Sequence, residues 1–317
     1  MTILDNLITL AQITGSIDTQ CSFNGDWYVR HPRNRTQGIV HIVTHGTGYL
    51  KLDNEAQARQ LQAGDIIFFP RNAAHALSSQ IGCNNTQHHP SIQQQGNITH
   101  KQTHSTSNSP AQLNLYCAHF AYETHNNLLQ GLPEIIILNT QHTTTQAIVT
   151  LLQHEISQPE HRATAAINAL STVLLVHILR AYLNQNEHQA PLTGILNGWR
   201  DRRLRNVVQA VTQQPEHDWR VEDLAALAKL SRAQLMRLFR SQMQTSPHAF
   251  VNSIRLQKAA MLLRNSQSTI LTIALESGYQ SETHFGKVFK KHYGCTPKQY
   301  RQQPNPADTQ KTEDYII

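Results

Sequence analysis

A short sequence pattern occurs twice, 50 residues apart, in the C-terminal third of this chain. The two copies are residues 224–242 and 273–291. The offset aligns helix-capping, apolar and basic positions in turn: Ser231 with Ser281, Leu235 with Phe285, Leu238 with Val288, Phe239 with Phe289, Arg237 with Lys287, and Arg240 with Lys290. Two copies are too few for a solenoid, so the pattern indicates a duplicated functional unit.

Each copy predicts a short helix, a tight turn and a second helix. Ser231 and Ser281 are residues that favour the N-cap position, so each is expected to begin a second helix. In that second helix the apolar residues fall on one stripe. The opposite face carries small and basic side chains, which are Ala233, Arg237 and Arg240 in the first copy and Thr283, Lys287 and Lys290 in the second. A helix with these two faces suits the major groove of DNA.

The distribution of charge supports this interpretation. Residues 201–301 contain 16 Lys and Arg against 7 Asp and Glu, a net charge of +9. Residues 1–200 contain 10 against 11, and the residues after 301 contain 1 against 3. Positive charge gathered in one segment is typical of phosphate binding. An all-helical domain with solvated basic faces is the alternative, and two copies in register argue against it.

Residues 201–301 resemble the AraC/XylS family of transcription regulators. In the second copy the similar residues are the run 269–279, then Ser281, Phe285, Phe289, Lys290, Tyr293-Gly294, Thr296-Pro297 and Tyr300-Arg301. Between the copies, the family's linking helix is matched at Ser246-Pro247, Phe250, Arg255-Leu256, Ala259 and Leu262-Leu263. The resemblance implies that one chain inserts two helices into successive major grooves, about 34 Å apart. It also implies contact with RNA polymerase and an activating role.

Nine side chains in the two second helices are candidates for contacts with double-stranded DNA. The candidates for base contacts are Arg232, Ala233, Arg237, Thr283, His284 and Lys287. The candidates for phosphate contacts are Arg240, Lys290 and Lys291. Arginine is the commonest reader of guanine, whereas phosphate contacts add affinity without sequence information.

The length of 317 residues allows two domains, and the pattern predicts an α+β protein. We expect an N-terminal cupin-like β-barrel with a helical dimerisation segment, and a C-terminal all-α domain with two helix-turn-helix units. The predicted boundaries are a sensor over 1–190, a linker over 191–200, a DNA-binding domain over 201–302 and a disordered tail over 303–317. The sensor is expected to begin with a helix over 1–20, and the DNA-binding domain with a helix over 201–211 that places Arg202, Arg203 and Arg205 near phosphates.

The segment 38–79 has the alternation and turn residues of β-strands. Its features resemble the cupin-type sensor of many AraC-family members, over roughly residues 1–140: Gly38, His41, Val43, Gly46, Leu61, Gly64-Asp65, Phe69-Pro70 and His75. Such a barrel can enclose one small ligand, or its own side chains can fill it. The resemblance implies His41, Tyr49, Phe69 and His75 as pocket residues.

Histidines raise the question of a metal. His41 and His45 on one strand would lie about 13 Å apart, too far to share an ion, so no catalytic metal is expected. The polar segment 81–111 contains almost no apolar residues and is predicted to be a mobile loop. It is either a solvated loop or a metal-sensing loop, with candidate ligands at His88, His89, His100, His104, Cys117 and His119.

Residues 143–185 have a helical pattern, and the apolar surface of 164–184 is wider than one packing partner needs. It predicts either a core helix or a homodimer seam. The most apolar run, 169–179, is shorter than the ~20 residues that span a bilayer, and the N-terminus lacks a basic region typical of a signal peptide. Four cysteines without a CxxC spacing fit a reducing cytoplasm. A cytoplasmic protein without a membrane partner is expected.

Together these patterns predict a sequence-specific transcription regulator, an activator by resemblance, whose N-terminal domain senses a small molecule or mediates dimerisation. No cofactor is expected. Two alternatives stay open: a metal-responsive regulator that uses the His-rich loop, and a metallo-cupin enzyme fused to a DNA-binding domain. The sequence contains no GxSxG, HExxH or P-loop motif, so the protein is not expected to be an enzyme.

Overall fold

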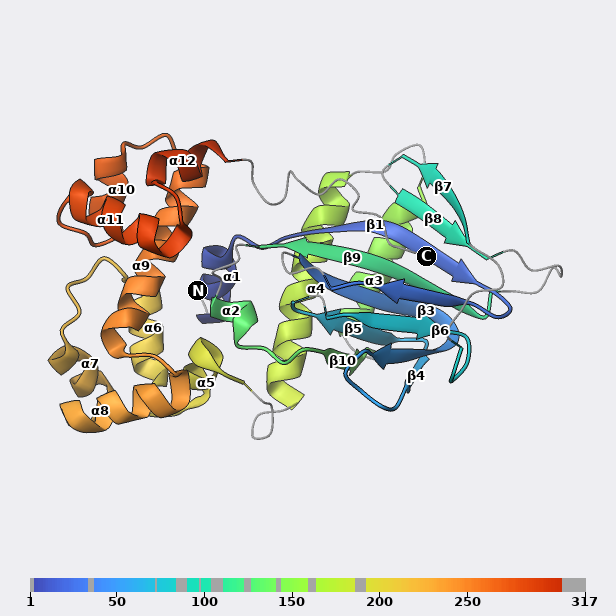
Figure 1. Ribbon diagram of the computed structural model, residues 1–317, viewed down its shortest axis with the longest axis horizontal. Coiled ribbons are helices and arrows are strands. Elements are labelled where there is room, and N and C mark those ends of the chain that lie inside the picture. The colour runs from blue at the N-terminus through green and yellow to red at the C-terminus, as the bar shows by residue number, and fades with distance from the viewer. Residues whose placement is uncertain are drawn as a thin grey trace. The chain divides into compact units, whose positions relative to one another are not determined.

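The computed structural model describes residues 3–33, 37–71, 73–83, 90–96, 98–103, 111–122, 127–140, 144–158, 164–185 and 192–303. The chain divides into two compact units (Figure 1). One unit is rich in β-strands and contains β1 to β10 with two helices, α3 and α4. The other is helical and contains α1, α2 and α5 to α12.

The β-rich unit is a curled sheet of ten strands. Their bounds are β1 Thr14–Phe23, β2 Tyr28–His31, β3 Gln37–Leu52, β4 Arg59–Gln62, β5 Asp65–Phe69, β6 His75–Ser78, β7 Ser91–Gln95, β8 Ile98–Gln102, β9 Leu113–Ala121 and β10 Ile136–Asn139. The main path runs β10-β5-β3-β9-β1-β8-β7, while β4 and β6 pair with the far half of β3, and β2 pairs with β6. The β1–β8 pair is parallel, and the other pairs in the described residues are antiparallel.

The long strand β3 connects the two parts of the sheet, and it changes partner at Gly46. Residues before Gly46 pair with β5 and β9, and those after it pair with β4 and β6. Gly46 has a φ of +82°, and a Cβ there would lie 1.7 Å from the carbonyl oxygen of Gln112. Only glycine fits this close approach, so the bend that closes the sheet over its core depends on this residue.

The concave side of the sheet contains a core of large apolar side chains. Along β1 buried residues alternate with exposed or half-buried ones, which directs Cys21 and Phe23 inward. Phe23 stacks on Trp27 with ring centroids 4.7 Å apart. The other members of this core include Val29, Val43, Leu50, Leu52, Ile67, Phe69, Leu77, Leu113, Leu115 and Cys117. The barrel interior is therefore largely filled by the chain's own side chains.

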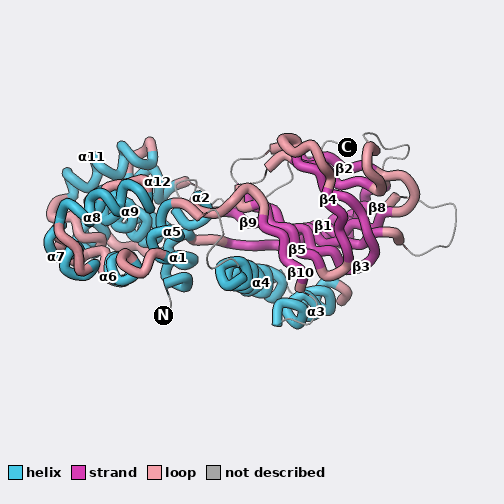
Figure 2. Tube along the Cα trace, turned by 90° about the horizontal axis from the view of Figure 1, so that it is seen from below, coloured by secondary structure: helices cyan, strands magenta, loops and turns pink. Residues whose placement is uncertain are grey.

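Helices α3 (Thr144–Ile156) and α4 (Thr164–Gln185) contact each other, and α4 contacts β1 and β10. Figure 2 shows both helices along one side of the sheet. The stretch Thr164–Asn184 has a mean hydropathy of 1.5 and is long and apolar enough to cross a membrane by composition alone. It contacts the sheet and α3, so it covers part of the sheet within this unit.

The helical unit contains two helix-turn-helix pairs joined by a long helix. Its elements are α1 Ile3–Ala11, α2 Asn127–Gln130, α5 Gly194–Arg200, α6 Arg205–Gln213, α7 Val221–Ala228, α8 Arg232–Leu238, a π-helix η1 at Phe239–Met243, α9 Pro247–Asn265, α10 Ile270–Glu276, α11 Glu282–Tyr293 and α12 Pro297–Gln302. Figure 1 shows the pair α7–α8 at one end of α9 and the pair α10–α11 at the other. The predicted α+β class and the two helix-turn-helix units are confirmed.

Near the N-terminus, the helix expected over 1–20 ends at Ala11. Gln12 has a φ of +48°, and β1 begins at Thr14. The following residues alternate with period two, and this strand signal outweighs the apolar stripe of the first turns. The helix α1 also contacts α6 and α9 and belongs to the helical unit, as does α2, whereas both lie inside the predicted sensor 1–190.

The predicted loop 81–111 instead contains the hairpin β7–β8, and β8 pairs with β1 from Thr19 to Ser22. The prediction missed these strands because most of their side chains are polar, although Ile98 is buried and backbone hydrogen bonds join β8 to β1. The predicted linker 191–200 contains α5, whose Ile195 and Leu196 are buried. The helix expected at 201–211 begins at Arg205, because Asp201 accepts hydrogen bonds from the backbone and guanidinium of Arg203. The tail 304–317 lies outside the described residues.

Candidate nucleic-acid interface and a buried histidine cluster

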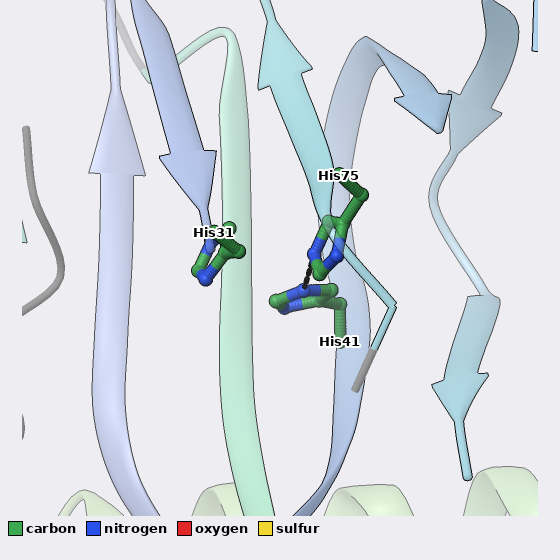
Figure 3. Close-up of side chains that lie close together, drawn as sticks. All are labelled: His31, His41 and His75. Carbon is green, nitrogen blue, oxygen red and sulfur yellow. Dashed lines mark hydrogen bonds between the residues drawn. The ribbon is translucent and has the colours of Figure 1, made fainter. Parts of the chain in front are cut away.

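Three histidines from three strands meet in the core of the β-rich unit. His31 ends β2, His41 lies in the middle of β3, and His75 begins β6. Figure 3 shows the three rings converging. One ring nitrogen of each lies within 4.8 Å of the others, and the Nε2 atoms of His41 and His75 are 2.8 Å apart. Within the described residues, this is the one group of three or more His, Cys, Asp or Glu with that geometry.

Hydrogen bonds fix the orientation of two of the three rings. His75 Nδ1 lies 2.7 Å from the carbonyl oxygen of Ala73, so Nδ1 carries the proton and donates. Neutral His75 then accepts at Nε2, and His41 donates from its own Nε2. His41 Nδ1 is 3.2 Å from Sγ of Cys117, which donates its thiol proton to it. This chain of bonds leaves every ring in the network uncharged.

Burial accounts for the neutral state. Desolvation lowers the pKa of His31 and of His41 well below the ordinary value, and repulsion from His75 lowers both further. Desolvation also lowers the pKa of His75 to about 4, although the Ala73 carbonyl opposes the shift. The hydrogen bond with Cys21, and then burial, raise the pKa of the Cys117 thiol, so it too is uncharged at neutral pH.

The surroundings of the cluster are close-packed. Phe69 stacks on the ring of His75 at a centroid distance of 3.9 Å, and the rings of His31 and His75 stack at 4.7 Å. Beside the cluster lies a cavity of about 10 Å³. It is lined by Thr19, Cys21, Phe23, Val29, His31, Leu77, Lys101, Leu115 and Cys117. A cavity of this size admits about one water molecule.

In the first helix-turn-helix of the helical unit, the second helix, α8, begins after Ser231, as the sequence predicts. Ser231 is the N-cap of α8: its hydroxyl accepts from the Gln234 backbone N–H, and Gln234 Oε1 accepts from the Ser231 N–H at 2.9 Å. The side chains of Leu235, Leu238 and Phe239 are buried. The four predicted DNA-contacting residues of α8 and of the π-helix η1 that follows it are exposed: Arg232, Ala233, Arg237 and Arg240.

Two of these arginines have weak contacts within the helical unit. Arg232 Nη1 lies 3.3 Å from Oε1 of Glu222, and both side chains are well exposed. Exposed ion pairs of this kind are worth about 0–1 kcal/mol, so a phosphate or a base edge can displace the carboxylate. Arg237 donates from Nε to the carbonyl oxygen of Ala233 at 3.3 Å. Both guanidinium groups can therefore be redirected at small cost.

The second helix-turn-helix follows the same plan. Ser281 is the N-cap of α11, and its hydroxyl accepts from the His284 backbone N–H. Phe285 and Phe289 are buried in an aromatic cluster with Tyr279 and Tyr300. The five predicted DNA-contacting residues of this helix are exposed: Thr283, His284, Lys287, Lys290 and Lys291.

The linking helix α9 ties the two pairs together through Arg255. This side chain donates to the carbonyl oxygens of Pro215 and His217, both at 2.8 Å, in the loop before α7. Its Nε also lies where a Cβ on Gly278 would be only 2.8 Å away, and Gly278 has a φ of +88° in the turn between α10 and α11. Arg255 therefore holds the loop before α7 by hydrogen bonds and packs closely against the turn of the second pair.

Comparison with known proteins finds two families along the chain. Residues 3–184 match a family described as cupin, and residues 224–303 match a helix-turn-helix domain family. The HTH-type transcriptional regulator MtrA of Neisseria gonorrhoeae is 47% identical over 303 residues, covering 96% of this chain and 99% of its own length. The chain belongs to the AraC-type transcriptional regulators.

Two further proteins are similar to this AraC-type regulator. The RCS-specific HTH-type transcriptional activator RclR of Escherichia coli K12 is 27% identical over 310 residues, covering 96% of this chain and 98% of its own. The crystal structure of ToxT from Vibrio cholerae O395 covers 91% of this chain and 96% of its own, with 14% identity and a TM-score of 0.36. The family assignment rests on the sequence matches. A regulator of this family binds double-stranded DNA and controls transcription.

The structure of the AraC-type regulator brings together some of the predicted sensor residues. His41, Phe69 and His75 meet in the core. Tyr49 is the neighbour of buried Leu50 on β3, and because successive side chains of a strand alternate, it faces away from that core. Sequence reasoning missed His31, whose signal was the alternation of Trp27, Val29 and His31 along one face.

The predicted metal ligands of the His-rich loop do not come together in the described residues. His88, His89 and His104 lie outside them. His100 lies on β8, His119 pairs with Asp18 at 2.8 Å, and Cys117 contacts His41 instead. His45 is exposed on β3, so it is not part of the cluster, consistent with the strand-distance argument.

Proposed function

We propose that the helical unit recognises its operator by placing α8 and α11 in successive major grooves of one DNA face. One observation carries the proposal: each helix buries its apolar stripe and exposes every side chain that the sequence assigns to DNA. Base contacts would come from Arg232, Ala233, Arg237, Thr283, His284 and Lys287. Phosphate contacts would come from Arg240, Lys290 and Lys291. The two helix-turn-helix pairs lie at opposite ends of α9, which supports simultaneous DNA binding by α8 and α11 (Figure 1).

The ion pairs of the helical unit support the same assignment. Within residues 201–301, four of the seven acidic side chains are already engaged: Asp201 with Arg203, Glu216 with Lys258, Glu222 with Arg232 and Asp223 in the N-cap of α7. The lysines of α11 have no acidic partner among the ion pairs of the described residues. An uncompensated basic face is the surface that releases counterions on binding to DNA.

Selection of genomic DNA tests this proposal. Full-length protein would be incubated with fragmented genomic DNA at about 150 mM salt, and the retained fragments sequenced. We expect a few promoter-proximal sites, each with two half-sites about 10–10.5 bp apart from centre to centre. Uniform retention that only follows salt concentration would contradict base readout, because it would mean that phosphate contacts alone bind the DNA.

We further propose that the β-rich unit regulates DNA binding and that the protein is a cytoplasmic activator that contacts RNA polymerase. Membership of the AraC-type family and the activator name of RclR support the activating role. The cupin-like interior supports a sensing role. Relatives named as regulators, not enzymes, support a chain without catalytic activity. Fusion of the selected promoters to a reporter gene, with and without this protein, would test activation directly.

Dimerisation through α4 is proposed as a further regulatory feature. Val173 is 43% exposed on this helix, and Ala169 and Val176 lie one turn away on the same side. A small apolar stripe of this kind suits contact with a second copy of the same helix. Val173→Glu would introduce a charge into that contact and is expected to yield monomers in sedimentation analysis. A dimer that persists in this variant would exclude α4 as the seam.

A further inference from the structure

We propose that His31, His41 and His75 bind one transition-metal ion, Cu⁺ or Zn²⁺, and that this ion is the effector sensed by the β-rich unit. The inference deepens the proposed regulatory role of that unit and rests on it. Three strands that are distant in sequence each contribute one imidazole to one point in a sealed core (Figure 3). The three histidines therefore do not form a motif within any one strand.

The distances between the ring nitrogens are close to those of a metal site. An ion held ~2.0–2.1 Å from each imidazole sets the three nitrogens roughly 3.3–3.6 Å apart in tetrahedral or trigonal geometry. His41 and His75 are nearer than this, at 2.8 Å, and the widest separation in the group is no more than 4.8 Å. Side-chain rotations that move each ring nitrogen by about an ångström would make the three nitrogen–nitrogen distances equal. The strands would not have to move.

Hydrogen bonds already orient a ligand nitrogen toward the centre of the cluster. Metal ligation uses the unprotonated nitrogen of a neutral imidazole. His75 is held by the Ala73 carbonyl with its Nε2 lone pair directed at the centre of the cluster. His41 needs only a change of tautomer. Its proton moves from Nε2 to Nδ1 and is then donated to Sγ of Cys117, so that Nε2 can bind the ion with no net loss of a proton. Cys117 is thus a positioning residue.

The size of the interior favours an ion over an organic molecule. Pockets for organic ligands measure about 300–1,000 Å³, whereas the cavity beside the cluster measures about 10 Å³. The chemistry of the donors then selects the class of ion. Imidazole suits Zn²⁺ and copper, and hard ions such as Mg²⁺ and Ca²⁺ prefer oxygen ligands. The sulfurs of Cys21 and Cys117 and the ammonium of Lys101 line the same cavity, which favours a soft ion of low charge.

Metal binding to the full-length protein tests the site. The untagged protein would be stripped with a chelator and titrated with Zn²⁺, or with Cu⁺ under anaerobic reducing conditions, in competition with a chromogenic chelator. We expect one tightly bound ion per chain. His31→Phe, which keeps a flat ring against His75, should weaken binding at least ~10-fold, the effect known for loss of an outer-shell partner alone. Cys117→Ala is a milder second variant and should weaken binding ~10-fold.

His45→Phe is the matched control, because His45 is an exposed histidine on the same strand as His41. It should bind the ion as the unsubstituted protein does. Circular dichroism would show whether each variant is folded, and Cys117→Ala provides the test should His31→Phe prove unfolded. Absence of tight binding of either ion would overturn the proposal. So would tight binding that all variants retain, because the ion would then lie elsewhere on this histidine-rich chain.

The regulatory half of the proposal is tested on a selected operator. One equivalent of ion should change the operator affinity of the unsubstituted protein and of His45→Phe by about 5–150-fold, the usual range of allosteric coupling. The affinity of His31→Phe should not respond. A bound ion that leaves both operator affinity and reporter expression unchanged would refute an effector role. Failure to distinguish operator from random DNA would instead contradict the proposed DNA readout, and the metal stoichiometry would still be measurable.

Discussion

The two helix-turn-helix units share their buried residues and differ in their exposed ones. The serine N-caps and the apolar stripes superpose at an offset of 50 residues, and both stripes are buried except for the partly buried Val288. On the outer face, Arg232 stands where the second unit has Glu282, and Arg237 where it has Lys287. The duplicated pattern therefore specifies a common fold, while recognition has diverged between the copies. Because α8 offers arginine where α11 offers lysine, we expect the half-site bound by α8 to discriminate between bases more strongly than the half-site bound by α11.

The units also differ in how their second helices end. Helix α8 passes at Phe239 into a π-helical turn, which stops at Gln244 with a φ of +56°, whereas α11 stays α-helical until Gly294. A left-handed conformation costs more for glutamine than for glycine. The first unit thus carries local strain beside its candidate phosphate contact Arg240, and π-turns are frequent at functional sites.

The largest expected effect concerns the buried apolar residues of the two helix-turn-helix units. Phe285→Ala would remove a ring that is fully buried between Tyr279 and Phe289, and we expect a loss of about 3–5 kcal/mol in the free energy of unfolding. Leu235→Ala, at the equivalent position of the first unit, is expected to cost about 2–5 kcal/mol. Urea denaturation of the full-length protein would measure both. If either substitution lowered the free energy of unfolding by less than about 1 kcal/mol, these apolar stripes would not be packed in a hydrophobic core.

The second prediction separates the two readouts. Arg237→Ala should cost about 1–3 kcal/mol of operator affinity and relax specificity at one base position. Lys287→Ala, at the same place in the second unit, should cost less, because lysine cannot form the two parallel hydrogen bonds that arginine makes with guanine. Competition binding with single-base operator variants would measure each loss. An equal loss by Arg237→Ala on all DNA sequences would reassign this residue to a phosphate contact.

A third prediction addresses the shared N-caps. Ser231→Ala and Ser281→Ala should each lower the free energy of unfolding by about 1 kcal/mol, because one N–H at the start of each helix loses its acceptor. The first unit retains the reciprocal bond from the Ser231 N–H to Gln234, so its loss should be the smaller one. Thermal unfolding under identical conditions would compare the two variants. Equal losses would indicate that the reciprocal bond contributes little.

The smallest expected effect is electrostatic. Lys290→Ala should reduce the slope of log affinity against log salt concentration by about 0.9, the value for one phosphate contact, with a nearly uniform loss on all sequences. Arg240→Ala, its counterpart in the first unit, should do the same. Glu276 carries an opposite charge in the same pair of helices, and Glu276→Gln should leave the slope of the operator complex unchanged or steeper. A slope unaffected by Lys290→Ala would exclude that contact.

Local signals in the sequence were sufficient to predict the helical unit. N-cap serines, stripes at helical spacing and a basic opposite face are all set within one element, so the sequence predicted α8 and α11 and the side chains that they expose. The curled sheet was predicted in outline only. Its hairpin β7–β8 is held by backbone bonds to β1, which polar side chains do not signal. The segment 191–200 was expected to be a linker because of its Asn, Pro and Gly content, but burial of Ile195 and Leu196 stabilises a helix there.

The histidine cluster shows the limit of motif reasoning most clearly. On β3 the only other histidine is His45, which lies four residues from His41, too far along one strand to share an ion. The actual neighbours of His41 are His31 on β2 and His75 on β6. Strand pairing places only His31 beside His75, whereas His41 pairs with Ile67 and Cys117 and approaches both histidines across the interior of the curled sheet. A register of this kind depends on the bend at Gly46 and on tertiary packing, which one sequence does not reveal.

We propose that α8 and α11 of one chain read two half-sites on one face of the DNA. The measurement that tests this is binding to an operator that carries a 5-bp insertion between its half-sites. Half a helical turn would rotate the second half-site to the opposite face, so only one recognition helix could bind its bases. We predict a loss of affinity of at least ~10-fold, comparable to deletion of one half-site. An affinity unchanged by the insertion would contradict the account, because the two helices would then bind independently or one of them not at all.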